Sequence, residues 1–520
     1  MLGNADHKVT YPARRPRTAR WLLPSPIDVA FLLLLVSATV IRGWQAINTD
    51  GDLGRHIRVG ETILMRGSLF HEDLFSWTMA GAPFVPYEWL SEICFAVAHR
   101  IGGIPAVLAM TGAVIASSYL LLALLLRRRG VDPLFAFIVT IMAGLVSAFH
   151  WLARPHVFSF LGVVLLLSLL EGRKPQDAES GAGGPFRPPV LPSFRAALAA
   201  FLLFVLWANL HGGFLYGLVM LGMYLVGDLV SDRAALPRHG LMLIAALAGS
   251  CANPVGPALL EHVTGYLGNT FLVDMTLEYR SPDFHGWVGR TFLVALLCTI
   301  ASLGLSARRL SWPHLVVFLG TTAFALHSVR NVPLWALTAF PLAAMHFDTD
   351  WKAVGGRGLA RLRLAFDGAQ REFGAGVWST AGTLVIGALA LAGGKIGSLQ
   401  LLEPGFDPRI FPVAEVQRLR EAGHRGRLFN ELAWGGYILY AWPQQKVFID
   451  GQTDFYGEEL SRRYVAIRAA EGNWRDALRQ AGVRLILLPP EAPLVRVLDG
   501  SGWRRVSSDQ TSVLLERVDD

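Results

Sequence analysis

The sequence predicts a polytopic α-helical membrane protein with about eleven spans and a carboxyl-terminal extracytoplasmic α/β domain. Hydrophobic residues make up 52% of the 520 residues and charged residues only 17%, with a mean hydropathy of +0.40, which is more apolar than a soluble protein normally is. Apolar runs close to the ~20 residues that cross a bilayer recur over the first three quarters of the chain. Residues 396–520 lose this pattern.

Each apolar run is expected to form one membrane-spanning helix, although several runs are short for a span. The runs cover residues 27–44, 104–126, 133–151, 157–170, 196–210, 214–230, 241–252, 291–305, 314–326, 333–345 and 378–394. We therefore expect a membrane domain over residues 1–395 and a second domain over residues 396–520.

Arginine-rich segments indicate the orientation of this membrane domain. They occur near the amino terminus and at residues 127–130, 171–174, 231–239, 307–309 and 357–371, all on one side of the predicted spans. By the positive-inside rule this side is the cytoplasm of a multi-pass protein of the cell inner membrane. An odd number of spans then places residues 396–520 outside. Because the net charge of +7 reflects this placement, we expect no nucleic-acid partner.

The segments between the spans differ in character. The first outer loop, residues 46–103, predicts an amphipathic helix over 53–66 and a second helix over 88–100. Residues 171–195 are rich in Pro and Gly and predict a flexible cytoplasmic linker. A second outer loop covers residues 253–290.

The last domain alternates helix-like and strand-like patterns, as a small α/β domain would. Asp450 ends a predicted strand, "QKVFID", where α/β sheets often place ligand-binding residues. Since Asp-Gly is a strong turn signal, we interpret Asp450 as a turn residue instead.

Polar residues gather at the outward ends of the predicted spans, whereas the cytoplasmic ends carry only basic flanks. Charge near a membrane is costly, so a one-sided cluster indicates a functional site. The cluster contains Asp50, Asp52, His56, Arg154, His156, Asn209, His211, Asn253, Glu278, Tyr279, Arg280, His327, Arg330 and Asn331.

This mixture of side chains indicates group transfer from a lipid-linked phosphate donor to an acceptor on the outer leaflet. A carboxylate can take the proton of an acceptor hydroxyl. Arginine and histidine can bind a phosphate and offset the charge that develops on a departing oxygen. The candidate phosphate contacts are Arg154, His156, Arg280 and Arg330.

Structural interpretations remain open for the same residues. Asp52 could cap the helix that begins near Leu53. Each arginine could extend its head group to the membrane interface. His211 could be satisfied by a neighbouring span, and Glu278 could pair with Arg280.

The sequence also carries a family resemblance. The first outer loop, "DGDLGRHIRVGETILMRGSLFHEDLFSWTMAGAPFVPYEWL", resembles that of the membrane-embedded C-type (GT-C) glycosyltransferase superfamily. Together with "ARPH", "NLHGG", "ANP" and "VFIDGQTDFYG", it is similar to a poorly characterised bacterial group of that superfamily. The resemblance covers most of the chain.

The resemblance implies inverting transfer of a sugar from a polyprenyl phosphate or diphosphate to a glycan, lipid or protein. Asp50 and Asp52 match the superfamily's acidic positions, and one would be the general base; we favour Asp50, which lies nearer the predicted membrane edge. A divalent cation could bind the two carboxylates and His56, and no other cofactor is expected. A transporter or flippase, or a non-catalytic scaffold for envelope glycan assembly, are the competing interpretations.

Overall fold

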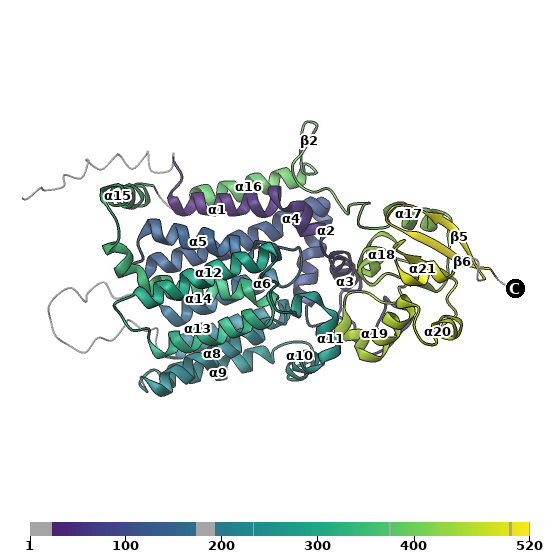
Figure 1. The fold of residues 1–520 in the computed structure, drawn as a ribbon, viewed down its shortest axis with the longest axis horizontal. Coiled ribbons are helices and arrows are strands. Elements are labelled where there is room, and N and C mark those ends of the chain that lie inside the picture. The colour runs from purple at the N-terminus through teal and green to yellow at the C-terminus, as the bar shows by residue number, and fades with distance from the viewer. Residues whose placement is uncertain (1–22, 173–192, 232, 374–375, 499–501, 519–520) are drawn as a thin grey trace, which may run out of the picture.

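The computed structural model is elongated, with a helical bundle at one end and the carboxyl-terminal domain at the other (Figure 1). The predicted linker lies almost entirely outside the described residues. The structure describes residues 23–172, 193–231, 233–373, 376–498 and 502–518.

Each of the eleven apolar runs coincides with a helix, or with a series of short helices in the case of the first run. The elements of this part are α1 (Pro26–Val36), η2 (Ser37–Ile41), α2 (Gly43–Asn48), α3 (Leu53–Arg66), α4 (Trp89–Arg128), α5 (Pro133–Ser147), η3 (Ala148–His150), α6 (Val157–Glu171), α7 (Ser193–Leu210), α8 (Phe214–Val230), α9 (Leu236–Ser250), α10 (Ala258–Gly268), α11 (Thr270–Met275), η4 (Leu277–Tyr279), α12 (Trp287–Leu305), α13 (Trp312–His327), η5 (Val329–Asn331), α14 (Val332–Ala353), α15 (Arg357–Glu372) and α16 (Val377–Leu391).

The lengths of these helices support a membrane location. Among the described residues, α4, α5 with η3, α7 and α12 are long and apolar enough to cross a membrane, and the bent pair α15 and α16 would add a fifth span. Other apolar helices, such as α6 and α8, are shorter. The number of eleven spans therefore stays a prediction.

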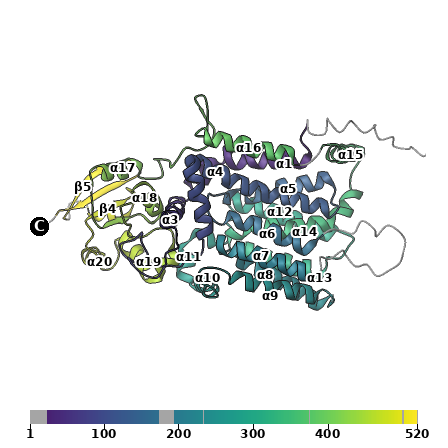
Figure 2. The same cartoon turned by 180° about the vertical axis from the view of Figure 1, so that it is seen from behind.

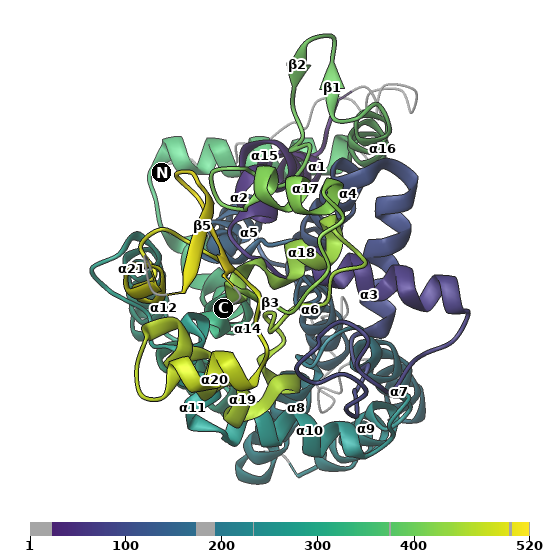
Figure 3. The same ribbon diagram turned by 90° about the vertical axis from the view of Figure 1, so that its right-hand side faces the viewer.

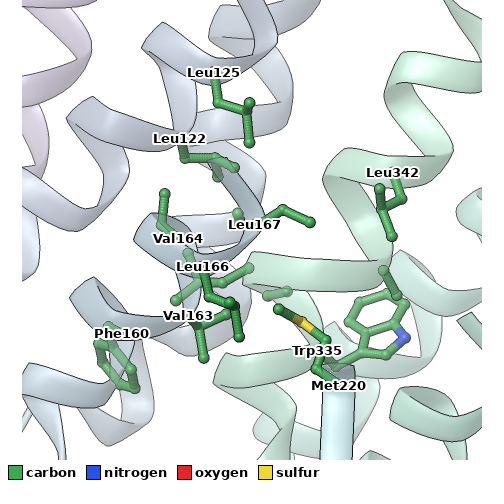
Figure 4. Packing of buried hydrophobic residues seen from close by; sticks show 14 of the residues in the cluster. Leu122, Leu125, Phe160, Val163, Val164, Leu166, Leu167, Met220, Trp335 and Leu342 are labelled. Carbon is green, nitrogen blue, oxygen red and sulfur yellow. The ribbon is translucent and has the colours of Figure 1, made fainter. Parts of the chain in front are cut away.

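The bundle is held together by closely packed apolar side chains. Figure 4 shows Leu122 and Leu125 of α4 near Val163 and Leu167 of α6, with Trp335 of α14 beside them, and each is at most 2% exposed. Because lipid is itself apolar, such packing in a bilayer stabilises through van der Waals contact rather than through exclusion of water.

The amphipathic helix predicted over residues 53–66 is confirmed as α3, which runs across the end of the bundle (Figure 3). Ile57 belongs to the apolar cluster of the bundle, whereas Val59 and Ile63 belong to that of the carboxyl-terminal domain. The helix predicted over 88–100 forms with the following span one long helix, α4, which is broken at Gly102 and Gly103.

The carboxyl-terminal domain contains a four-stranded sheet. Its strands follow the order β3-β4-β6-β5, in which β3 and β4 are parallel and the other pairs are antiparallel. The domain and the hairpin before it contain β1 (Lys395–Ile396), β2 (Leu399–Gln400), α17 (Val413–Glu421), β3 (Leu428–Asn430), η6 (Leu432–Trp434), α18 (Gly435–Ala441), α19 (Thr453–Ala469), α20 (Trp474–Gln480), β4 (Leu485–Leu488), α21 (Pro493–Leu498), β5 (Trp503–Ser508) and β6 (Val513–Arg517).

One strand was predicted wrongly. "QKVFID" is an extended loop in which Val447 forms an isolated bridge with Ser76 of the first outer loop. Thr78 of that loop also donates a hydrogen bond of 2.6 Å to the Phe448 carbonyl. The segment therefore lies between the first outer loop and the sheet without joining the sheet, and Phe448 packs on Phe429 of β3 with ring centroids 4.8 Å apart.

Basic segments lie at the end of the bundle away from the carboxyl-terminal domain. The arginine-rich α15 lies at that end in both views (Figures 1 and 2). The Arg129 guanidinium donates to the Glu171 carbonyl at the end of α6 at 2.7 Å, and Arg238 donates to the Leu169 carbonyl at 2.7 Å. Three basic clusters that are far apart in sequence therefore share one end.

Candidate active site

A cavity of about 460 Å³ lies where the bundle meets the carboxyl-terminal domain. Its wall is built from the start of α3, the start of α4, the α5–α6 and α7–α8 connections, α10, η4, η5 and residues 451–454. Eight of the ten predicted site residues line it: Asp52, His56, Arg154, His156, His211, Glu278, His327 and Arg330. The structure thus brings together side chains from five separate segments of the sequence.

The other two predicted residues, Asp50 and Arg280, do not line the cavity. Arg280 is exposed, and its guanidinium reaches only the Asp274 carbonyl, at 3.4 Å. The predicted pairing of Glu278 with Arg280 is also not formed, because Glu278 instead lies 3.4 Å from Arg154. Asp50 lies behind the wall, where its carboxylate accepts from the Asp52 backbone N–H at 2.9 Å and pairs with Arg154.

Arg154 is held by three carboxylates. It contacts Asp50, lies 2.7 Å from Asp52 and 3.4 Å from Glu278. Its positive charge is therefore neutralised by carboxylates of the protein, and these contacts hold the acidic pair in place.

Asp52 is the carboxylate of the pair that faces the cavity. It stands at the first position before α3, but its side chain makes no capping hydrogen bond, so the capping interpretation is not supported. Desolvation in the cavity wall, together with the nearby Asp50 charge, raises the pKa of Asp52 to about 7, although Arg154 acts in the opposite direction. A carboxylate with such a pKa is well matched to accept a proton near neutral pH.

Three histidines line the wall beside Arg154. The imidazole centroids of His150 and His156 lie 4.2 Å apart with the rings tilted by 38°, and His156 donates through Nε2 to the His150 carbonyl at 2.8 Å. His211 Nδ1 accepts from the Gly213 N–H at 2.9 Å, so its proton lies on Nε2, which is 3.8 Å from Glu88. Burial lowers the pKa of His156 and His211 well below the usual value, which leaves both neutral at pH 7.

The charged residues behind Asp52 were not predicted as site residues. Arg55 is 4% exposed and pairs with Asp450 at 3.3 Å and with Glu92 at 3.6 Å. Glu92 also lies 3.4 Å from His56. The interpretation of Asp450 as a turn residue is incomplete: it does accept from the Gln452 N–H at 2.9 Å, but it is 1% exposed and carries this ion pair. The sequence feature that could have identified Arg55 as a site residue is the high density of charged residues in the first outer loop.

Glycines bring the acidic motif against the carboxyl-terminal domain. A Cβ atom placed on Gly51 would lie 1.7 Å from the Ala433 carbonyl oxygen, and one on Gly54 would lie 2.4 Å from the Gly436 oxygen. A Cβ on Gly451 would lie 1.7 Å from Asp52 Oδ1. Backbone therefore packs directly on backbone here, and the domain forms part of the wall beside Asp52.

The part of the wall opposite the histidines is aromatic and acidic. The rings of Tyr87 and His262 are tilted against each other with centroids 5.4 Å apart, and His262 lies 3.0 Å from Asp454. The hydroxyls of Tyr266 and Thr453 lie 3.2 Å apart. These residues were not named as site residues in the sequence analysis; they come from three separate segments, namely the end of the first outer loop, α10 and the start of α19. Glu88 also faces the cavity, and burial raises its pKa well above the usual value.

Among the described residues, no group of three or more His, Cys, Asp or Glu side chains is arranged to hold a metal ion. His56 points toward Glu92, 3.4 Å away, rather than joining the acidic pair. The predicted ligand set of Asp50, Asp52 and His56 is therefore not assembled in this structure.

Comparison with solved structures identifies the architecture. The chain matches ArnT from Cupriavidus metallidurans bound to undecaprenyl phosphate with a TM-score of 0.50 at 12% identity, covering 94% of this chain and 97% of that one. It matches the archaeal oligosaccharyltransferase AglB from Archaeoglobus fulgidus, in complex with an inhibitory peptide and a dolichol-phosphate, with a TM-score of 0.56 at 11% identity, covering 89% and 69%. The chain has the GT-C fold.

The expected GT-C architecture is thus confirmed at the level of the fold. In sequence comparisons, no known protein family matches the chain. No curated protein matches it either. The GT-C fold leaves donor and acceptor open, and they must be argued from the cavity.

Proposed function

We propose that the protein transfers a glycosyl group from a polyprenyl-phosphate-linked donor to an acceptor at the outer face of the cell inner membrane. The observation that carries this proposal is the cavity itself, which combines a carboxylate of raised pKa with an accessible guanidinium on a GT-C fold. The two structural neighbours hold polyprenyl phosphates, which supports a donor of the same class.

Asp52 would act as the general base. The acceptor hydroxyl loses its proton to the Asp52 carboxylate while its oxygen attacks the anomeric carbon. The bond between this carbon and the phosphate oxygen breaks, and its electron pair leaves with the lipid phosphate. A single displacement of this kind inverts the anomeric configuration. Asp52 is favoured over Asp50, because Asp50 is turned away from the cavity by its contacts with Arg154 and the Asp52 N–H.

Arg330 would bind the lipid phosphate. Its guanidinium lies 4.4 Å from the centroid of the Tyr279 ring and forms no hydrogen bond or ion pair with another described residue. Arginine can therefore offer its full set of donors to a phosphate and offset the charge that develops as the sugar departs.

The orientation follows from charge. Three basic clusters lie at the end of the bundle opposite the cavity, and the positive-inside rule assigns that end to the cytoplasm. In this arrangement about eleven spans place the cavity and residues 396–520 outside.

The proposed partners follow from this location. Membrane lipids surround the bundle, and the acceptor is a glycan, lipid or protein.

A transfer assay tests the proposal. The protein in lipid nanodiscs is given synthetic undecaprenyl-phosphate sugars with a radiolabelled sugar, and an envelope extract from the host serves as the acceptor source. We expect label to move to a new product while undecaprenyl phosphate is released in equal amount, and we expect Asp52→Asn to abolish both. The exposed Asp476→Asn is the matched control and should retain activity. If the donor stays intact and only moves from one leaflet to the other, the protein would instead be a flippase. If the donor binds but is not turned over, the protein would be a non-catalytic scaffold.

A further inference from the structure

The charges that line the cavity bear on how the donor is joined to its lipid. Three guanidinium groups reach the wall, those of Arg55, Arg154 and Arg330, and no lysine of the described chain does so. The number of these cations that remain available sets how much phosphate charge the cavity can hold.

Two of the three guanidinium groups are already neutralised. Arg55 is enclosed between Asp450 and Glu92. Arg154 meets Asp50, Asp52 and Glu278, so its surroundings carry more negative charge than it supplies. Neither guanidinium can bind a phosphate unless it breaks an ion pair with a carboxylate in or behind the wall.

Four of the histidines in the wall do not supply free positive charge. His156 and His211 are neutral for the reasons given above, and burial likewise lowers the pKa of His56. His262 is paired with Asp454 at 3.0 Å. Arg330 is thus the one lining guanidinium in the described chain without a carboxylate within 4.0 Å.

We propose that the donor is linked through a single phosphate, not a diphosphate. This inference rests on the proposed function and specifies its substrate. A sugar phosphodiester carries one negative charge, and the phosphomonoester that leaves carries two once it is fully ionised. The single positive charge of Arg330 balances the one negative charge of the donor. It also stabilises the additional negative charge that develops on the phosphate as the bond to the sugar breaks.

A diphosphate would be poorly accommodated. Its donor form brings two charges and its leaving form three, while the acidic side chains of Asp52, Glu278 and Asp454 line the same cavity. Any phosphate beyond the reach of Arg330 would approach one of these acids without a cation to separate them.

Binding of the two lipid products tests the inference without knowledge of the acceptor. Undecaprenyl phosphate and undecaprenyl diphosphate are titrated separately onto the full chain in nanodiscs, with EDTA or with added Mg²⁺ or Mn²⁺, and binding is followed by native mass spectrometry. We expect the monophosphate to bind at least about tenfold more tightly under both conditions. Arg330→Gln should remove this binding, Arg330→Lys should restore part of it, and the exposed Arg280→Gln should leave it unchanged.

Equal or tighter binding of the diphosphate, with or without the metal, would overturn the inference and leave the proposed function standing. Failure of both lipids to bind the wild-type protein would count against the proposed function itself. Equal loss of binding in Arg280→Gln and Arg330→Gln would show that Arg330 has no special role.

Discussion

The contact between Gly451 and Asp52 gives a prediction whose size follows from the geometry. In Gly451→Ala the new methyl group would lie 1.7 Å from Asp52 Oδ1. Since separations below 3.0 Å are essentially never seen, the carboxylate or the loop must move by about 1.3 Å. Gly451 does not need a left-handed backbone, so the substitution acts through this clash alone.

A displacement of about 1 Å in a catalytic group can cost roughly 100-fold in rate. We therefore expect kcat/KM for glycosyl transfer to fall by about this factor in Gly451→Ala. The assay is release of undecaprenyl phosphate from a labelled donor. Affinity for undecaprenyl phosphate should not change, because this depends on Arg330. The control is Gly405→Ala in the same domain, where a Cβ meets nothing within 4 Å. A wild-type rate in Gly451→Ala would refute the proposed position of Asp52.

The remaining predictions concern charge. Because burial and Asp50 raise the pKa of Asp52 to about 7, the reactive carboxylate forms as pH rises through 7, and kcat/KM should fall below that pH. Because the folded protein holds this proton more tightly than the unfolded chain does, protonation of Asp52 favours the fold. This stabilisation is complete below the pKa of Asp52 in the unfolded chain and is lost as pH rises through 7, so the unfolding temperature should be higher at low pH. Asp50→Asn removes a charge that raises this pKa, so the midpoint of the rate profile should move to lower pH; an unchanged midpoint would contradict the coupling. Asp450→Asn leaves Arg55 with one buried partner and should lower the free energy of unfolding by roughly 3 kcal/mol in denaturant titrations, compared with less than about 0.5 kcal/mol for Asp476→Asn.

The sequence predicted the elements that depend on local pattern. The apolar face of residues 53–66 has helical periodicity, and α3 has these bounds. One-sided placement of polar residues predicted a single site, and eight of the ten named side chains do line one cavity.

What the sequence did not show depends on contacts between distant residues. Arg280 and Arg330 look alike as arginines at helix ends, and only the fold turns one outward and the other into the cavity. Likewise, nothing near Gly51 indicates that it packs on Ala433, almost four hundred positions later. "QKVFID" has the composition of a strand, but its partner, Ser76, lies in another loop.

The central claim is that Asp52 accepts the proton of the attacking hydroxyl during sugar transfer from the lipid donor. The most direct measurement compares the transfer rate at saturating donor for Asp52→Asn and Asp50→Asn with that of the wild-type protein at pH 8. Loss of a general base predicts a fall of about 100-fold to 10,000-fold for Asp52→Asn and a much smaller change for Asp50→Asn. Wild-type turnover by Asp52→Asn, with its fold intact, would contradict the account.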